Sequence, residues 1–215
     1  MSKIIVFGAG GNAGRRAVAE AATRGHEVTA VVRDPAKYSA LEQPGVRVVQ
    51  GDVTDAASVA AVAVGHDAAV STVFRADVPA GEFYSAAARA LVEGLGKAGV
   101  GRLVAVGVGT ALEVTPGVAV HDAPEFPDEY RQFSVGHSSE TDIFRAGDLT
   151  WVVVTPPPAV LDGEAERTGK YRVGVGSRLL PAEANAPAFS YADLAVALID
   201  VAADGKHGNE VIAVG

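Results

Sequence analysis

Residues 3–14 read KIIVFGAGGNAG, and this stretch decides the fold. Residues 3–7 form the short apolar run that is typical of a buried strand, and helical character begins at Arg15. A glycine-rich turn between a strand and a helix lets the pyrophosphate of a dinucleotide approach the backbone, which side chains would block. A merely structural glycine turn is the alternative. We predict that a cofactor contacts the turn residues Gly8, Gly10, Gly11, Asn12, Ala13 and Gly14.

The end of a second apolar run, residues 27–32, indicates which dinucleotide binds. An acidic residue there accepts hydrogen bonds from the ribose of NAD, whereas an arginine accommodates the 2′-phosphate of NADP. This chain has Arg33, and Lys37 offers a second positive charge, while Asp34 precedes Pro35 and suits a turn or a helix cap. An exposed surface charge is the alternative interpretation of Arg33. NADP(H) is therefore favoured, and NAD(H) stays open.

The composition excludes several classes of protein. The chain has 215 residues, 48% of them hydrophobic, and no cysteine, which rules out disulfides, thiolate nucleophiles and cysteine-ligated metals. A net charge of −8 opposes binding to nucleic acid. The five histidines lack metal-ligand spacing, so no metal is predicted. Without a signal peptide or an apolar run long enough for a membrane, we expect a cytoplasmic protein; its oligomeric state is left open.

Strand-like and helix-like segments alternate along the chain. Val-rich apolar runs separated by helical patterns predict a Rossmann-type, doubly wound parallel sheet in a three-layer α/β/α arrangement. We expect one domain over residues 1–215 with a small C-terminal substrate-side region. The further predicted strands are 46–50, 68–73, 103–106, 151–154 and 210–214; the helices are 56–64, 82–98, 129–146 and 191–203, and a hairpin-like stretch covers 171–180.

Two less regular stretches, about 108–127 and 155–187, follow the ends of predicted strands. Ligands of open α/β sheets bind beyond the carboxyl ends of the strands, so we predict that these are the substrate-side loops.

Several motifs spread over the chain carry a family resemblance. These motifs are GAGGNAG at 8–14, VRDP at 32–35, GDVTD at 51–55, VGVGT at 106–110, LTW at 149–151 with TPP at 155–157, RTGKYR at 167–172 and YADLA at 191–195. On these motifs the chain resembles the atypical, extended-family short-chain dehydrogenases/reductases, in the group that includes NAD(P)H-flavin reductases and NmrA-like NAD(P)-binding proteins.

This resemblance implies further cofactor contacts. Asp52 would accept a hydrogen bond from the adenine amine and the Val53 backbone would bond the ring edge, while Thr54 would cap the next helix. Ser71 and Thr72 would lie beside the adenosine ribose, although their hydroxyls could equally bond the local backbone. The residues expected under the nicotinamide ribose and ring, with open space above them for a flat group, are Gly107, Val108, Gly109 and Thr110. Pro156 is a further predicted cofactor contact.

No tyrosine has a lysine four residues later, so the chain lacks the proton donor of classical relatives. Such a loss suits a conjugated acceptor, which the protein mainly has to orient. His137 and Glu140, three residues apart on one helical face, are the candidate catalytic acid and base, and His121 is the second choice. A polar helix surface is the alternative interpretation of the pair.

The predicted function is an NAD(P)H-dependent oxidoreductase that transfers hydride to a planar small-molecule acceptor such as a flavin or a quinone. A non-catalytic NmrA-like redox sensor that binds NADP and a protein partner is the alternative from another class. An epimerase-like enzyme with tightly held NAD is a third possibility, which the missing Tyr-Lys pair disfavours.

Overall fold

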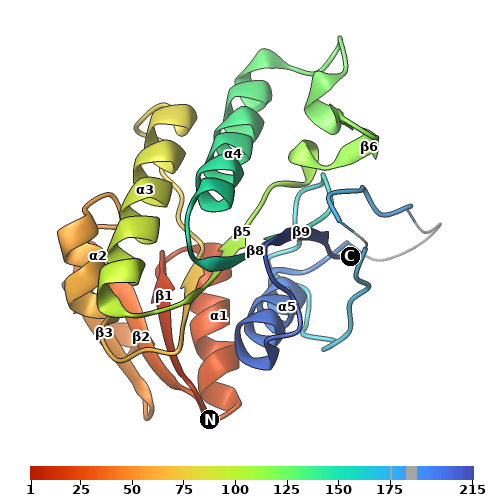
Figure 1. Cartoon of the computed structure of the whole chain (residues 1–215). Helices are drawn as coiled ribbons and strands as arrows, with labels where there is room; N and C mark the ends of the chain where they lie inside the picture. The colour runs from red at the N-terminus through yellow and green to blue at the C-terminus, as the bar shows by residue number, and fades with distance from the viewer. Residues whose placement is uncertain (175, 183–187) are drawn as a thin grey trace.

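The structure, a computed structural model, describes residues 1–174, 176–182 and 188–215. Its centre is a parallel seven-stranded sheet with the order β3-β2-β1-β4-β5-β8-β9 (Figure 1). This architecture confirms the predicted Rossmann-type fold. The strands are β1 (Lys3–Phe7), β2 (Glu27–Val32), β3 (Val46–Gln50), β4 (Ala68–Ser71), β5 (Arg102–Val106), β8 (Thr150–Thr155) and β9 (Glu210–Ala213).

Helices cover both faces of this sheet, which makes three layers. α1 (Asn12–Thr23) and α5 (Tyr191–Asp204) pack on one face (Figure 1). The other face carries α2 (Ala56–Ala63), α3 (Ala80–Ala98) and α4 (Asp128–Ala146). A hydrophobic core lies on each face of the sheet, and alternate residues of β1 point into one or the other. Ile4 packs with the α1/α5 layer, and Ile5 packs with the α2/α3/α4 layer.

The strand order places a ligand crevice at the middle of the sheet. β2 and β3 lie on one side of β1. The chain then crosses to the other side of β1, where β4, β5, β8 and β9 follow in order to the opposite edge of the sheet. Connections leave β1 and β4 in opposite directions at this point, so their carboxyl ends border a crevice. The glycine turn after β1 therefore lies at the switch point of the sheet.

Several predicted boundaries differ from the structure. α1 begins at Asn12 rather than Arg15, because Gly11 already has the extended backbone of a helix cap. β4 ends at Ser71, two residues early. The loop at 108–127 contains a small antiparallel pair, β6 (Glu113–Thr115) and β7 (Val118–Ala119).

The predicted hairpin at 171–180 includes Val175, which lies outside the described residues. On either side of it, the described residues pair with other parts of the chain: Val173 bridges Val214, and Arg178 bridges Glu113. Among the described helices, none has the length and apolar character needed to cross a bilayer.

Candidate functional site

Two glycines of the turn are required by its own geometry. Gly8 has a φ of +77°, and a Cβ there would lie 2.7 Å from the carbonyl oxygen of Thr72. A Cβ at Gly14 would lie 2.1 Å from the carbonyl oxygen of Gly8. Both positions therefore need glycine whether or not a ligand is bound.

Gly11 is different, because its Cβ position faces open space. The one atom near that position is the carbonyl oxygen of Gly8, at 3.4 Å. Gly11 is also the N-cap residue of α1, and no side chain caps the helix. The amides of the first turn, beginning at Asn12 and Ala13, are thus available for an anion, which the positive end of the helix dipole also favours.

A cleft of about 510 Å³ extends from this turn along the carboxyl ends of β1, β2 and β4. Most of the cofactor residues predicted in the first half of the chain border it. Tyr38, which the sequence did not identify, covers Gly10: a Cβ at Gly10 would meet the tyrosine ring at 2.3 Å. The residues that matter for the argument are Gly8, Gly10, Gly11, Arg33, Lys37, Tyr38, Asp52, Val53, Thr72, Phe74 and Arg75.

Three basic side chains, those of Arg33, Lys37 and Arg75, border the cleft. Lys37 lies 3.3 Å from Asp34 in an exposed ion pair. Within the described part of the chain, the Arg33 side chain makes no hydrogen bond or ion pair, so its donors are available. Arg75, which follows β4, donates to Asp77 at 2.8 Å, and this contact lowers the pKa of Asp77 to about 2. Arg75 was missed by the sequence reasoning, although its position after a strand end was a usable signal.

The loop after β3 is held by its own carboxylates. Asp52 Oδ1 accepts hydrogen bonds from the amide of Thr54 at 2.8 Å and from its hydroxyl at 2.7 Å, which lowers the pKa of Asp52. The prediction that Thr54 caps α2 is wrong: Asp55 does so, accepting from the Ala57 amide at 2.9 Å. Asp52 and Val53 both border the cleft, as an adenine contact requires.

Ser71 and Thr72 differ in their surroundings. The hydroxyl of Thr72 donates to the carbonyl oxygen of Phe7 at 3.0 Å, which is the local alternative considered above. Ser71 is 2% exposed and does not border the cleft. Among the described residues, its hydroxyl oxygen is the one fully buried side-chain nitrogen or oxygen atom that has no hydrogen-bond partner. The structure thus places Thr72, and not Ser71, at the cleft.

A second cavity, of about 150 Å³, lies between α4 and the ends of β5 and β8. It brings together Gly107 and Val108, which we expected near the nicotinamide, and His137, the candidate catalytic residue. Neither glycine fits the expectation of open space. A Cβ at Gly107 would lie 2.4 Å from Thr155 Oγ1, and a Cβ at Gly109 would lie 2.5 Å from the carbonyl oxygen of Pro156.

His137 and Glu140 form a buried pair, and the interpretation as a polar helix surface is wrong. They are 7% and 2% exposed, and His137 Nδ1 lies 3.2 Å from Glu140 Oε2. Burial raises the pKa of the Glu140 carboxyl, and the contact with His137 partly offsets that rise. The imidazole packs on Tyr84 of α3, with ring centroids 4.0 Å apart, and on the edge of Phe133. The ring is therefore fixed in orientation.

His121, the second choice, ties the 108–127 loop to α4. Its Nδ1 lies 2.7 Å from the hydroxyl of Ser134, which is fully buried, and 3.0 Å from the carbonyl oxygen of Thr110. These contacts indicate a structural role. No group of three or more acidic, histidine or cysteine side chains suitable for a metal is present among the described residues.

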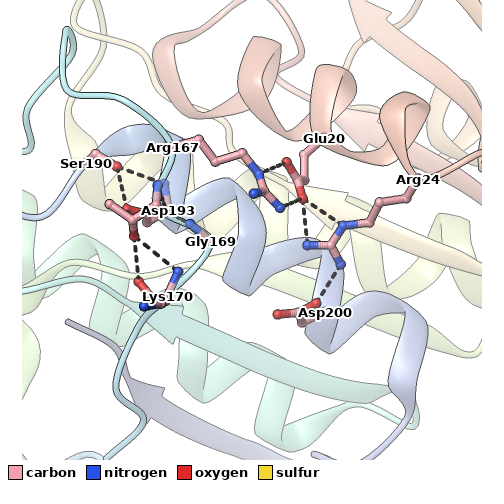
Figure 2. A network of polar contacts seen from close by, with 9 residues as sticks. Glu20, Arg24, Arg167, Gly169, Lys170, Ser190, Asp193 and Asp200 are labelled. Carbon is pink, nitrogen blue, oxygen red and sulfur yellow. Dashed lines mark hydrogen bonds and ion pairs between the residues drawn. The ribbon is translucent and has the colours of Figure 1, made fainter.

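A network of ion pairs and hydrogen bonds holds residues 167–169 of the substrate-side region against α1 and α5 (Figure 2). Glu20 of α1 lies between Arg167 and Arg24, accepting hydrogen bonds from each at 2.7 Å. Asp193 of α5 accepts from the amides of Thr168 and Gly169, at 3.0 and 2.8 Å. The RTGKYR and YADLA motifs, far apart in sequence, thus meet here. We name segment 162–172 the strap.

The sequence profile of a family of NAD(P)H-binding proteins matches residues 8–205. The chain therefore belongs to this NAD(P)H-binding family. Its glycine turn and cleft are the parts that such a cofactor needs.

Relatives extend the match to the whole chain. The uncharacterized protein YwnB of Bacillus subtilis is 32% identical over 211 residues, which cover 97% of this chain and 95% of YwnB. The crystal structure of a "putative NADH-flavin reductase" from Streptococcus pneumoniae is 28% identical, with a TM-score of 0.82 and coverage of 100% of this chain and 99% of that one. A "putative epimerase" from Bacteroides thetaiotaomicron is 30% identical, with a TM-score of 0.86 and coverage of 100% and 96%.

Proposed function

We propose that this protein is an NAD(P)H-dependent reductase that passes hydride to a planar acceptor. The observation that carries the proposal is the open face of Gly11, which borders the cleft beside the uncapped first turn of α1. A cofactor's pyrophosphate fits there, its adenosine fits the cleft, and its nicotinamide end would reach Gly107 and Val108. The name of the Streptococcus pneumoniae neighbour supports the reductase reading.

The charges in the cleft favour NADP(H) over NAD(H). Arg33, Lys37 and Arg75 all border the cleft. No acidic side chain occupies the strand-end position at which NAD enzymes bind the ribose hydroxyls. Asp34 follows Arg33, but it pairs with Lys37. We therefore propose that Arg33, assisted by Lys37, holds the 2′-phosphate.

The residues of the chain would mainly bind and orient. Bound NADPH supplies the hydride itself. Gly107, Val108 and His137 border the cavity beside α4, at which a flat acceptor would lie, and Glu140 holds His137 in place through the 3.2 Å contact with its Nδ1. An acceptor ring that delocalises charge needs little further acid catalysis, which suits a chain without the Tyr-Lys pair.

Turnover measurements test this proposal. NADPH oxidation at 340 nm should be catalysed with FMN, FAD or a quinone present, and Gly11→Val should remove both NADPH binding and turnover. The location in the cytoplasm and the short-chain dehydrogenase/reductase assignment stay predictions. Tight NADPH binding without reduction of any acceptor would instead support the redox-sensor alternative.

A further inference from the structure

The ring of Tyr38 fills the space that a side chain at Gly10 would occupy. A Cβ at Gly10 would lie 2.3, 2.5 and 2.9 Å from the Cε1, Cζ and Cδ1 atoms of this ring. Gly10 is not among the glycines with a positive φ, so its backbone conformation does not itself require glycine. The ring of Tyr38 is therefore the feature that excludes a side chain from this position of the turn.

The local backbone and the core hold Tyr38 in this place. The residue belongs to the short 3₁₀ helix η1 (Pro35–Leu41), and its φ of −128° and ψ of 21° interrupt that helix. Its ring packs against the hydrophobic core on the α1/α5 face of the sheet. The ring is thus supported both by the core and by the turn at Gly10.

The hydroxyl end of Tyr38 lies at the turn and has hydrogen-bonding capacity left. The ring atom that carries the hydroxyl is Cζ, the atom 2.5 Å from the Cβ position of Gly10. Within the described part of the chain, this hydroxyl has no hydrogen-bond partner, and Ser71 Oγ is the only fully buried side-chain nitrogen or oxygen that lacks one. The Tyr38 hydroxyl is therefore accessible from the cleft or from solvent, and it can donate to a ligand.

The turn lies directly beside the strand end that carries Arg33. β1 and β2 are paired, and the amide of Ala9 donates to the carbonyl oxygen of Val31 at 3.3 Å. Gly10 follows Ala9, and Arg33 comes two residues after Val31, so the turn, Tyr38 and Arg33 all meet at one cleft. This end of the second strand is where Rossmann folds bind the 2′ position of the adenosine ribose.

Tyr38 borders the proposed cofactor site without occupying it. The carbonyl oxygen of Gly8, at 3.4 Å, is the one atom near the Cβ position of Gly11, and no atom of Tyr38 comes within 4 Å of that position. A dinucleotide can therefore place its pyrophosphate at Gly11 and its adenosine ribose beside Tyr38 at the same time.

We propose that the Tyr38 hydroxyl donates a hydrogen bond to the 2′-phosphate of NADP(H), so that Tyr38 acts with Arg33 in selecting NADP(H) over NAD(H). The inference rests on the proposed binding of NADP(H) and adds an uncharged residue to that site. A hydroxyl that donates to an anionic oxygen forms a charge-assisted hydrogen bond, whereas NADH offers only a neutral hydroxyl at this position. Gly10 has to be a glycine because the ring that delivers the hydroxyl lies on it.

Removing the hydroxyl alone provides the main test. Tyr38→Phe keeps the ring over Gly10 and should raise the Kd for NADPH by about tenfold or more, because a hydrogen bond to a charged group is lost. The Kd for NADH should stay nearly unchanged. Tyr130→Phe is the matched control, since Tyr130 is an exposed tyrosine of α4 that is not among the residues bordering the cleft; it should change neither value.

Two smaller probes separate the phosphate from the rest of the cofactor. Adenosine 2′,5′-bisphosphate, which has no nicotinamide, should lose affinity for Tyr38→Phe by the same factor as NADPH. Adenosine 5′-monophosphate should bind wild type and Tyr38→Phe equally. Calorimetric titration measures both affinities without any turnover.

Gly10→Ala tests the position of the ring. The added methyl group should displace the Tyr38 ring, which is a side chain that can move, so the protein should fold and bind NADPH more weakly. In the double variant with Tyr38→Phe, NADPH should bind no more weakly than in Tyr38→Phe alone, because both changes remove the same hydrogen bond.

The outcomes distinguish this inference from the proposed function. An unchanged Kd for NADPH in Tyr38→Phe, equal losses for NADPH and NADH, or additive losses in the double variant each overturn the role of Tyr38. Wild-type protein that shows the expected dependence on Tyr38 but reduces neither FMN, FAD nor a quinone overturns the proposed reductase function and leaves the role of Tyr38 standing.

Discussion

Gly11 and Gly14 belong to one turn but serve different purposes. Gly11→Val should abolish NADPH binding and leave the circular dichroism spectrum and the Tm close to wild type, because its Cβ points into open space. Gly14→Val should destabilise the fold by about 1–3 kcal/mol or more, because its Cβ position overlaps the Gly8 carbonyl oxygen. Calorimetric titration and thermal melts measure both effects. Normal NADPH binding by Gly11→Val would show that the phosphate site lies elsewhere.

Arg33 decides the choice of cofactor in the proposed site. Arg33→Asp should weaken NADPH binding by about 1.5–3 kcal/mol, the contribution of a charge-assisted hydrogen bond, and should weaken NADH binding far less. Titration of both dinucleotides checks this expectation. Lys97→Gln is the control, since Lys97 pairs with Glu93 on α3 and is not among the residues that border the cleft. Equal losses for the two cofactors would contradict the assignment of the 2′-phosphate to Arg33.

Charged side chains hold the strap in position. Glu20 has a buried side chain, and Arg167 and Arg24 hydrogen-bond to it (Figure 2). Glu20→Gln should lower the free energy of unfolding by about 1–3 kcal/mol at pH 7, because hydrogen bonds to a charged group are lost. The matched control is Glu93→Gln, which removes an exposed pair with Lys97 and should cost well under 1 kcal/mol. Urea denaturation measures both.

The Glu20 carboxylate should make the attachment of the strap depend on pH. The hydrogen bond from Arg167 is the largest cause that lowers the pKa of Glu20, so the folded state binds its proton less readily than the unfolded state. The stabilisation by Glu20 is then present above its ordinary pKa and is lost as pH falls through the lowered value. Wild type should therefore lose its advantage over Glu20→Gln progressively over the acidic range below the ordinary carboxyl pKa of about 4.3. A difference that stays constant across that range would contradict the assigned role.

At the scale of the whole molecule, the cleft joins the two halves of the sheet, so a bound dinucleotide should stabilise the entire fold. NADPH at a hundred times its Kd should add about 2.7 kcal/mol to the free energy of unfolding. For a chain of this size, this corresponds to a rise in Tm of roughly 5–10 °C. NADH at the same concentration should give a smaller rise. A Tm that moves with neither dinucleotide would contradict the proposed cleft.

The sequence by itself determined the features that depend on local pattern. Apolar runs that alternate with helical patterns predicted the parallel sheet, and the glycines after β1 predicted the dinucleotide turn. Each of these patterns is contained in a short stretch of sequence, so no distant contact is needed to recognise it. The position of Arg33 and Lys37 after β2 likewise predicted them as cofactor contacts, and in the structure both border the same cleft.

The tertiary structure alone decided which groups meet across the fold. Gly109 looked open in the sequence, yet it faces the backbone of residues 156–158, which follow a different strand. Arg75, Tyr38 and Thr155 became site residues through the packing of separate elements. The burial of His137 and Glu140 depends on α3 lying against α4, and the strap depends on Glu20 meeting a partner 147 residues away. Long-range contacts of this kind leave no periodic signal in the chain, so the sequence could not show them.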